Sequence, residues 1–247
     1  MAAGGVKQQL HVPTPKTYVV EHLDPELGPW SILEYQTIAA ESCNDAAIFC
    51  LSSVPEDLIL PEALRAVPGL NIEHRSVETV YATSKDRVCL LDPAAQAELS
   101  PGDAAEFDVF LFGGILGDDP PRDRTSELRK KGFQGRRLGP VQMTTDTAVR
   151  VTRMVIQHQM ALDEIPFIDH PELKIDEHES TEMPFRYVRD SSGNPVMPKV
   201  SHAQTAVDFI VYGKAYSMIH KLTHPQCLKG MMELIKQDSE KGFGDLL

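Results

Sequence analysis

The sequence has little positive charge and no long apolar run. It contains 24 Lys and Arg against 36 Asp and Glu, so the formal net charge is −12. A surface this negative repels phosphate backbones, which disfavours nucleic acid as a partner and favours basic proteins. The longest apolar run, around Phe107–Leu116, contains Asp108 and two glycines. A membrane-spanning helix needs about 20 apolar residues, so we expect no membrane partner.

The common signatures of metal, phosphate and serine-hydrolase sites are also absent. The sequence has no H-E-x-x-H, G-x-G-x-x-G, G-x-x-x-x-G-K-[ST] or G-x-S-x-G pattern. His170, Asp176, His178 and Glu179 lie close together in the sequence but lack the spacing of metal ligands, so no metal is expected. These absences argue against a zinc enzyme, a P-loop nucleotide enzyme and an α/β-hydrolase.

The four cysteines form no C-x-x-C pair, and no signal-peptide pattern precedes them. They are Cys43, Cys50, Cys89 and Cys227. Unpaired cysteines without a secretory signal are typical of proteins in a reducing compartment. We therefore expect buried, reduced thiols in a cytoplasmic protein.

Strand and helix patterns alternate through the first two-thirds of the chain. Phe107–Phe112 is the clearest strand, because it is apolar almost throughout, as strands covered on both faces are. Thr145–Met160 is the clearest helix, with an apolar stripe from Ala148 to Met160. Further strands are predicted at 18–20, 46–51, 88–91, 165–168 and 185–188, and further helices at 31–41, 58–66, 125–131 and 230–239. This alternation predicts an α/β fold with a mainly parallel sheet.

Three loops with Gly or Pro follow predicted strands or lead into the best helix: Leu91-Asp92-Pro93, Gly113–Asp118 and Leu138–Thr145. Ligands of parallel sheets bind beyond the carboxyl ends of the strands, so these loops are candidate binding segments. Three plain structural alternatives apply in this region: a tight turn at Gly113–Gly117, a solvated charged loop at the neighbouring segment Asp118–Thr125, and helix capping by Thr144 or Thr145 in the stretch that leads into the best helix.

Longer motifs resemble one family. FGGILGDDPPRDRT, RRLGPVQMTTDTAVR and TEMPFRYV are similar to segments of the SPOUT-class protein-arginine N-methyltransferases of fungi. The known member of that family modifies a protein of the small ribosomal subunit. The resemblance covers Tyr18 to about Val196 and resumes at Gly230–Leu247.

The resemblance implies a SPOUT-type α/β fold with a C-terminal trefoil knot and S-adenosylmethionine as cofactor. In such enzymes the knot loops form the cofactor pocket, and they coincide with the three loops above. The residues that the resemblance assigns to cofactor binding are Leu91, Asp92, Pro93, Phe112, Gly113, Gly114, Leu116, Gly117, Arg137, Leu138, Gly139, Gln142, Met143, Thr144 and Thr145. Backbone groups near Leu138 and Met143 are expected to read the adenine.

Within this resemblance, acidic side chains are the expected catalytic groups. A guanidinium stays protonated, and carboxylates paired to two of its nitrogens orient the third for attack. We assign this role to Asp118 and Asp123, with Glu182 and Glu21 as further candidates, whereas Asp146 is expected to cap a helix.

The domain organisation follows from where the resemblance holds. We expect a disordered tail at 1–16, a methyltransferase domain at 17–199, an unusual insert at 200–229 and a final helix of the domain at 230–247. The insert begins with Val200-Ser201, which GTA-AGT can encode, so we interpret it as a retained intron or gene-model error. The alternative is a genuine partner-binding helix.

Two other functions remain open. A SPOUT enzyme acting on tRNA or rRNA is the nearest rival, although the −12 charge disfavours it. A non-catalytic ribosome-assembly factor with the same fold is the third. The substrate is expected to be a basic small-subunit ribosomal protein, and the enzyme a monomer.

Overall fold

The computed structural model describes residues 15–22, 26–113, 125–174 and 180–198. In these ranges the chain forms a six-stranded sheet in the order β3-β2-β1-β5-β4-β6, and every neighbouring pair is parallel. Its strands are β1 (Thr17–Glu21), β2 (Ile48–Ser52), β3 (Leu70–Ile72), β4 (Val88–Leu91), β5 (Val109–Gly113) and β6 (Gln134–Arg136). The prediction of an α/β fold with a mainly parallel sheet is confirmed.

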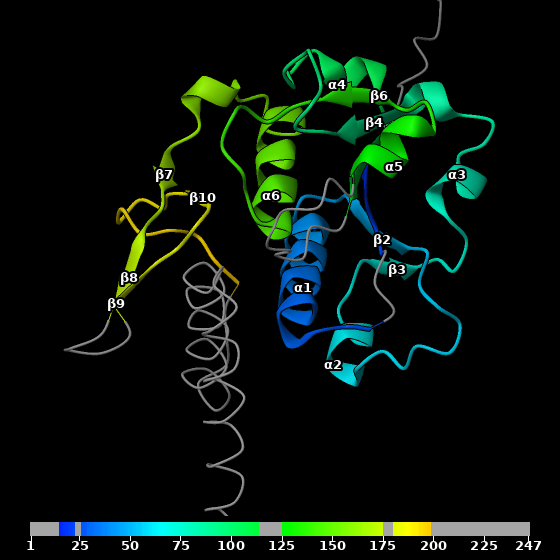
Figure 1. Cartoon of the computed structure of the whole chain (residues 1–247), viewed down its shortest axis with the longest axis horizontal. Helices are drawn as coiled ribbons and strands as arrows, with labels where there is room; N and C mark the ends of the chain where they lie inside the picture. Colours follow the sequence, from blue (N-terminus) through cyan, green and yellow to red (C-terminus); the bar gives the residue numbers. More distant parts are fainter. Residues whose placement is uncertain (1–14, 23–25, 114–124, 175–179, 199–247) are drawn as a thin grey trace, which may run out of the picture.

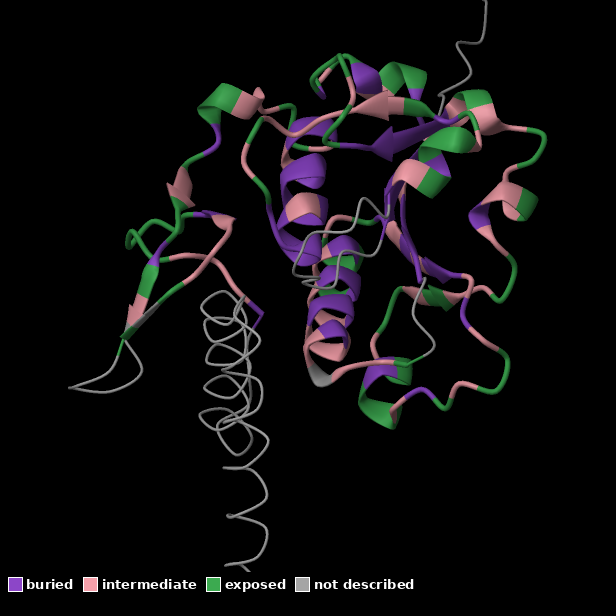
Figure 2. Cartoon of the chain, in the orientation of Figure 1, coloured by how far each residue is buried: buried purple, intermediate pink, exposed green. Residues whose placement is uncertain are grey.

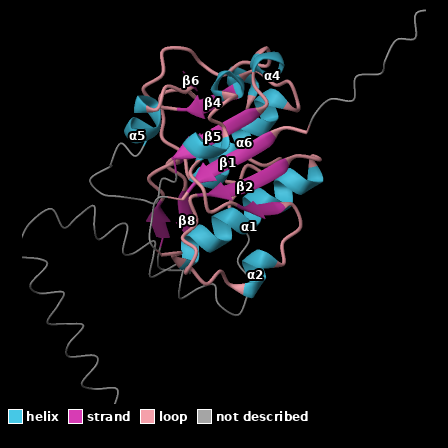
Figure 3. Cartoon of the chain, turned by 90° about the vertical axis from the view of Figure 1, so that its right-hand side faces the viewer, coloured by secondary structure: helices cyan, strands magenta, loops and turns pink. Residues whose placement is uncertain are grey.

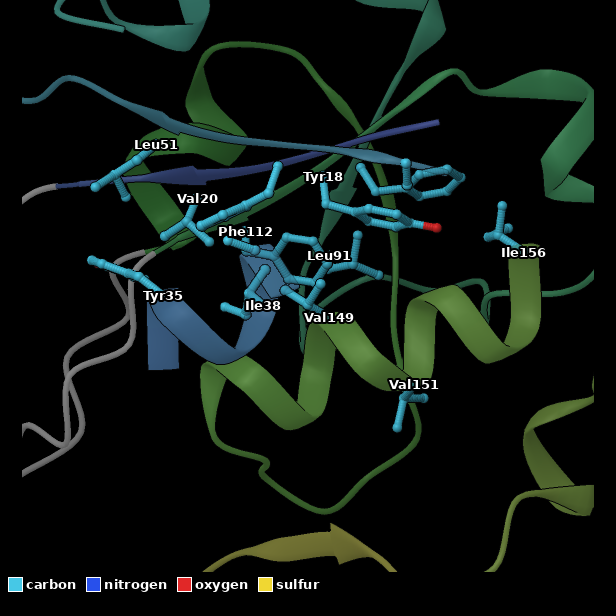
Figure 4. Close-up of a cluster of buried hydrophobic side chains, with 14 of the residues drawn as sticks. Tyr18, Val20, Tyr35, Ile38, Leu51, Leu91, Phe112, Val149, Val151 and Ile156 are labelled. Carbon is cyan, nitrogen blue, oxygen red and sulfur yellow. The ribbon is translucent and has the colours of Figure 1, made fainter. Parts of the chain in front are cut away.

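Two long helices cover one face of this sheet. They are α1 (Pro29–Asn44) and α6 (Thr145–Ile156), which contact each other side by side (Figures 1 and 3). Alternate strand residues such as Tyr18, Val20 and Phe112 point towards Tyr35 and Ile38 of α1 and Val149 of α6 (Figure 4). This cluster is the larger part of the core.

The opposite face of the sheet has its own, smaller core. Val19, between Tyr18 and Val20, points to this side, as the two-residue period of a strand requires. It packs in a cluster with Val77 of the short helix α3 (Val77–Val80) and Leu128 of α5 (Thr125–Lys130). The central strands β1, β5 and β4 are therefore covered on both faces and buried along most of their length (Figure 2), whereas the edge strands β3 and β6 have no buried residue.

Shorter elements complete the fold. The remaining helices are α2 (Glu62–Arg65), α3 (Val77–Val80), α4 (Asp103–Glu106) and α5 (Thr125–Lys130), with 3-10 turns at Lys85–Arg87 and Leu162–Glu164. After α6, the strands β7 (Phe167–Asp169) and β10 (Arg186–Val188) pair antiparallel, as do β8 (Glu172–Lys174) and β9 (Ser180–Glu182). No helix in the described ranges is long and apolar enough to span a membrane.

Two predicted helices differ from the observed ones at their ends. The helix predicted at 145–160 ends at Ile156 with Gln157 as its C-cap, and the left-handed Gln159 (φ 57°) beyond it does not continue the helix. Met160 lies beyond the helix but still packs against the core, which is why the apolar pattern of the sequence extends to it. The helix predicted at 58–66 begins only at Glu62. Pro61 is its N-cap, and a proline is tolerated at a helix start but not in the interior, where it would lack the N–H for a helical hydrogen bond.

Two further sequence predictions need correction. Cys89 is buried, but Cys50 is only partly buried and Cys43 is exposed, so the expectation of buried thiols was wrong for Cys43. Lys16, assigned to the disordered tail, donates hydrogen bonds to the carbonyls of Ala104 and Phe107 at 2.7 Å each and belongs to the folded part.

Several predicted parts of the chain lie outside the described residues. They are the N-terminal tail up to residue 14, the insert at 200–229 with Cys227, and the final helix at 230–247. The same holds for the part of the predicted knot that falls there.

Candidate functional site

The candidate site lies at the carboxyl edge of the parallel sheet. The register pairs Leu91 of β4 with Phe112 of β5 and with Arg136 of β6, and Glu21 of β1 with Gly113 of β5. The three predicted loops therefore start from adjacent strand ends. Of the second loop, Phe112 and Gly113 are described, whereas Gly114, Leu116, Gly117 and Asp118 lie outside the described residues.

Asp92 anchors the first loop. Its side chain is 2% exposed and forms a two-point ion pair with Arg129 of α5, with Nη2–Oδ1 at 2.7 Å and Nε–Oδ2 at 2.5 Å. It also accepts the Ala94 N–H at 2.9 Å. Burial opposes the charged form, but the hydrogen bonds from Arg129 and Ala94 outweigh it and hold the pKa of Asp92 below its ordinary value. The carboxylate of Asp92 thus ties α5 to the β4 loop.

The third loop is joined to the first by backbone hydrogen bonds. The Arg137 N–H donates to the Ala97 carbonyl at 2.9 Å, and the Leu99 N–H donates to the Arg137 carbonyl at 3.0 Å. The Arg137 side chain reaches Glu98 at 3.2 Å. Gly139 has φ +88°, a left-handed conformation that favours glycine.

The segment between Leu138 and Thr144 leaves backbone donors unused. Met143 is buried and Leu138 packs against the main core. Within the described part of the chain, the N–H groups of both residues donate no hydrogen bond. A buried N–H without an acceptor is rare in folded proteins, so the N–H of the buried Met143 fits an acceptor supplied by a ligand such as a nucleobase. The N–H of the partly buried Leu138 is open to the same ligand. Gln142 is exposed, and its carbonyl accepts the Arg186 N–H at 2.9 Å.

The start of α6 is capped from another helix. Thr144 occupies the N-cap position, but its hydroxyl bonds the Asp146 carboxylate at 2.7 Å and the Thr147 hydroxyl at 2.8 Å and caps no amide. The Thr145 N–H instead donates at 3.0 Å to Glu34 of α1. The expectation that Thr144 caps with its own side chain was wrong, because Glu34 accepts the Thr145 N–H instead. The prediction that Asp146 caps the helix is confirmed, since its carboxylate accepts the Thr147 N–H in the first turn of α6.

Glu34 and Asp146 form a buried acidic pair. The pKa of Glu34 lies well above its ordinary value, chiefly because the carboxyl group is buried and secondly because the Asp146 charge is near. Hydrogen bonds from N–H groups at the start of α6 favour the charged form and offset part of this rise. Burial also raises the pKa of Asp146, against the opposing charge of Arg150 at 3.3 Å. Sequence reasoning missed Glu34; its only signal is helical spacing of i, i+4 from the buried Ile38.

A second charged cluster holds α1 and α6 together further along their length. Glu41 accepts from Arg150 and from Arg153, each at 2.7 Å. Arg153 also pairs with Asp45. Both arginine side chains are 8% exposed, so these pairs are largely shielded from water. They make the α1–α6 interface polar and specific without touching the loops.

The structure describes two of the four candidate catalytic carboxylates, Glu21 and Glu182. Asp118 and Asp123 lie outside the described residues. Glu21 lies at the carboxyl edge, buried, where it accepts from the hydroxyls of Ser52 and Ser53 and from the Val77 N–H.

Glu182 lies elsewhere. It is exposed in the β8–β9 hairpin, opposite Glu172. In Figure 1, α1 and α6 lie between this hairpin and the sheet. Among the described residues there is also no group of three or more His, Cys, Asp or Glu that could hold a metal ion.

Comparison with known proteins identifies the family. The family model "Protein arginine N-methyltransferase SFM1-like" matches residues 17–209. Protein arginine N-methyltransferase SFM1 of Saccharomyces cerevisiae is 39% identical over 246 residues, covering 93% of this chain and 99% of its own.

Solved structures agree with this match. The yeast arginine methyltransferase SFM1 complexed with SAM has 40% sequence identity and a TM-score of 0.69, covering 83% of this chain and 94% of that one. The same enzyme complexed with SAH has 43% identity and a TM-score of 0.66, covering 74% and 91%. The chain therefore belongs to the SFM1-like family of protein arginine N-methyltransferases.

Proposed function

We propose that this protein transfers the methyl group of S-adenosylmethionine to an arginine side chain of a basic protein of the small ribosomal subunit. Membership of the SFM1-like family makes it a protein-arginine methyltransferase, and its relatives are complexed with SAM and SAH, so S-adenosylmethionine is its methyl donor. The observation that carries the site is the meeting of three loop-bearing strand ends at one sheet edge.

The described residues fit the cofactor through their backbone. The unused N–H groups of Leu138 and Met143 would hold the adenine between apolar walls, and the loop after Leu91 would border the rest of the molecule. S-adenosylmethionine supplies an activated methyl group with a neutral leaving group. The protein therefore has mainly to position the two reactants and to shape the local charge.

Carboxylates would orient the arginine. Asp118 and Asp123, on the segment that leaves β5 at Gly113, are the proposed partners of two guanidinium nitrogens, which leaves the third free to face the methyl group. Glu21 lies next to Gly113 in the register, but its carboxylate already accepts three hydrogen bonds within the protein. We therefore rank it behind the two aspartates.

The acidic composition supports a basic protein substrate over RNA. The net charge of −12 would oppose the neutralisation of phosphates on which RNA binding depends. The same charge raises the encounter rate with a lysine- and arginine-rich protein. An RNA-methylating relative and a non-catalytic assembly factor are the alternatives that the test must separate.

We further infer a SPOUT-class knot, a monomer and a cytoplasmic location. The parallel sheet and the three loops at its carboxyl edge support the SPOUT class. Cys43, Cys50 and Cys89 are unpaired, which accords with a reducing compartment.

The proposed function is tested with labelled S-adenosylmethionine and small ribosomal subunits from cells that lack the methyltransferase. We expect label that is released by protease, resists ribonuclease and is recovered as methylarginine. Label released by ribonuclease would instead identify an RNA methyltransferase, and cofactor binding without any transfer would favour an assembly factor.

Variants locate the catalytic carboxylates. Asp118→Asn and Asp123→Asn should each abolish transfer while S-adenosylhomocysteine still binds. Asp57→Asn, at an exposed aspartate before α2, is the matched control and should retain full activity. Unchanged turnover in Asp118→Asn would remove that residue from the mechanism.

A further inference from the structure

The proposed cofactor segment 138–144 is held at both ends by partners outside it, and the Arg186 N–H holds the Gln142 carbonyl between them. At its start, the backbone of Arg137 is paired with Ala97 and Leu99 of the β4 loop. At its end, the Thr145 N–H is held by Glu34, which lies 111 residues earlier in the chain on α1. The end of the segment, two residues after Met143, is thus held by a side chain of another helix.

Glu34 has no local substitute. The first N–H groups of a helix have no partner within the helix, and a nearby Ser, Thr, Asp or Asn side chain usually satisfies one of them. Here the Thr144 hydroxyl is engaged by Asp146 and Thr147, and the Asp146 carboxylate accepts the Thr147 N–H rather than that of Thr145. Thr145 and Asp146 are 4% and 1% exposed, so water does not readily replace the missing acceptor.

Glu34 is itself held firmly. It is 1% exposed and lies within a sixteen-residue helix whose neighbouring Tyr35 and Ile38 are part of the main core. The N–H of Asp146 and the indole of Trp30 also favour its charged form. A buried carboxyl group on a rigid helix is a fixed reference point, whereas a capping side chain in the loop would move with the loop.

We propose that Glu34 is a positioning residue for the cofactor: it fixes the junction between segment 138–144 and α6, and thereby aims the backbone donors of Leu138 and Met143. This inference rests on the proposed function, because it takes that segment as the cofactor segment. Glu34 does not touch the cofactor and acts through Thr145.

The α1–α6 interface offers a matched control. Glu41 lies two turns along α1 from Glu34 and, like it, joins α1 to α6, through Arg150 and Arg153. It has no described contact with segment 138–144. Glu41→Ala therefore weakens the same interface without releasing the Thr145 N–H.

The test measures the Kd for S-adenosylhomocysteine by calorimetry, together with thermal stability, in the full-length protein. Glu34→Ala should raise this Kd about tenfold, the effect of losing one buried cap. Glu34→Gln keeps a side-chain oxygen for the Thr145 N–H and should stay within about threefold of the parent. Glu41→Ala should lower the melting temperature and leave the Kd unchanged.

A local readout separates positioning from general destabilisation. Amide hydrogen exchange of the Thr145–Thr147 stretch should speed up in Glu34→Ala and not in Glu41→Ala, when both are measured well below their melting temperatures. If Glu34→Ala does not fold, Glu34→Asp, which withdraws the carboxyl group by one methylene, is expected to show the same pattern to a smaller degree.

The results that would overturn the inference are specific. Provided that the parent protein binds S-adenosylhomocysteine, two results refute the positioning role. One is an unchanged Kd in folded Glu34→Ala or Glu34→Asp, and the other is an equal rise of the Kd in Glu41→Ala. If the parent itself fails to bind S-adenosylhomocysteine, the proposed function fails, and the inference fails with it.

Discussion

The ion pair between Asp92 and Arg129 should respond unequally to loss of its two partners. The Asp92 side chain is 2% exposed, whereas that of Arg129 is 39% exposed. Without Asp92, the guanidinium can be hydrated where it lies. Without Arg129, a buried carboxylate keeps only the Ala94 N–H as a described partner.

The magnitudes follow from this difference in burial. Breaking a fully buried pair costs about 3–5 kcal/mol, and because water reaches the Arg129 side, we expect about 2–3 kcal/mol for Arg129→Met. Asp92→Asn keeps an acceptor for the Ala94 N–H and should cost about 1 kcal/mol. At about 2–4 °C per kcal/mol for a protein of this size, the melting temperatures should fall by about 4–12 °C and 2–4 °C.

A double-mutant cycle with thermal unfolding is the assay. It isolates the pair from the other contacts of Arg129, and the double variant should be more stable than Arg129→Met alone, because no buried charge remains. The pKa of Asp92 lies below its ordinary 3.8, so the stabilisation exists above that pH and disappears as the pH falls through the lowered value. Equal losses for the two single variants, or a double variant no more stable than Arg129→Met, would refute this reasoning.

Three further changes test other parts of the site. Gly139→Ala and Gly132→Ala place a side chain at φ +88° and +83° and should each cost about 1–2 kcal/mol, but only Gly139→Ala should weaken S-adenosylhomocysteine binding in calorimetry. Because burial raises the pKa of Glu34 above its ordinary 4.5, the parent should lose stability relative to Glu34→Gln as the pH rises from 4.5, and parallel melting curves would contradict this. Arg186→Lys loses the fork to Asp169 and should cost about 1 kcal/mol in denaturant unfolding, while binding persists because the Arg186 backbone bond to the loop remains.

The large elements of the fold were predictable because they bury whole faces. β5 is buried at every position and α1 spans the predicted 31–41, so their apolar patterns stand out in the sequence. β3 (Leu70–Ile72) was missed, since three residues are too few to show a period of two. The same limit applies to β8 and β9, whose pairing shows only in the folded chain.

The candidate loops were predictable for a different reason. Glycine and proline at the ends of apolar runs mark where strands stop, and parallel strands stop at one edge. The side-chain partners that hold these loops in place were not predictable. Thr145 is 111 residues from Glu34, and Asp92 is 37 residues from Arg129, so sequence spacing carries no trace of either contact.

These distant partners have a common physical reason. The backbone groups that a loop offers to a ligand, such as the N–H groups of Leu138 and Met143, cannot also hold the shape of that loop. The scaffold has to hold the loop instead: Arg129 holds the loop after β4, and Glu34 holds the end of segment 138–144. The residues that tune this enzyme should accordingly include side chains of α1 and α5 that never touch the cofactor, and a search confined to the loops would miss them.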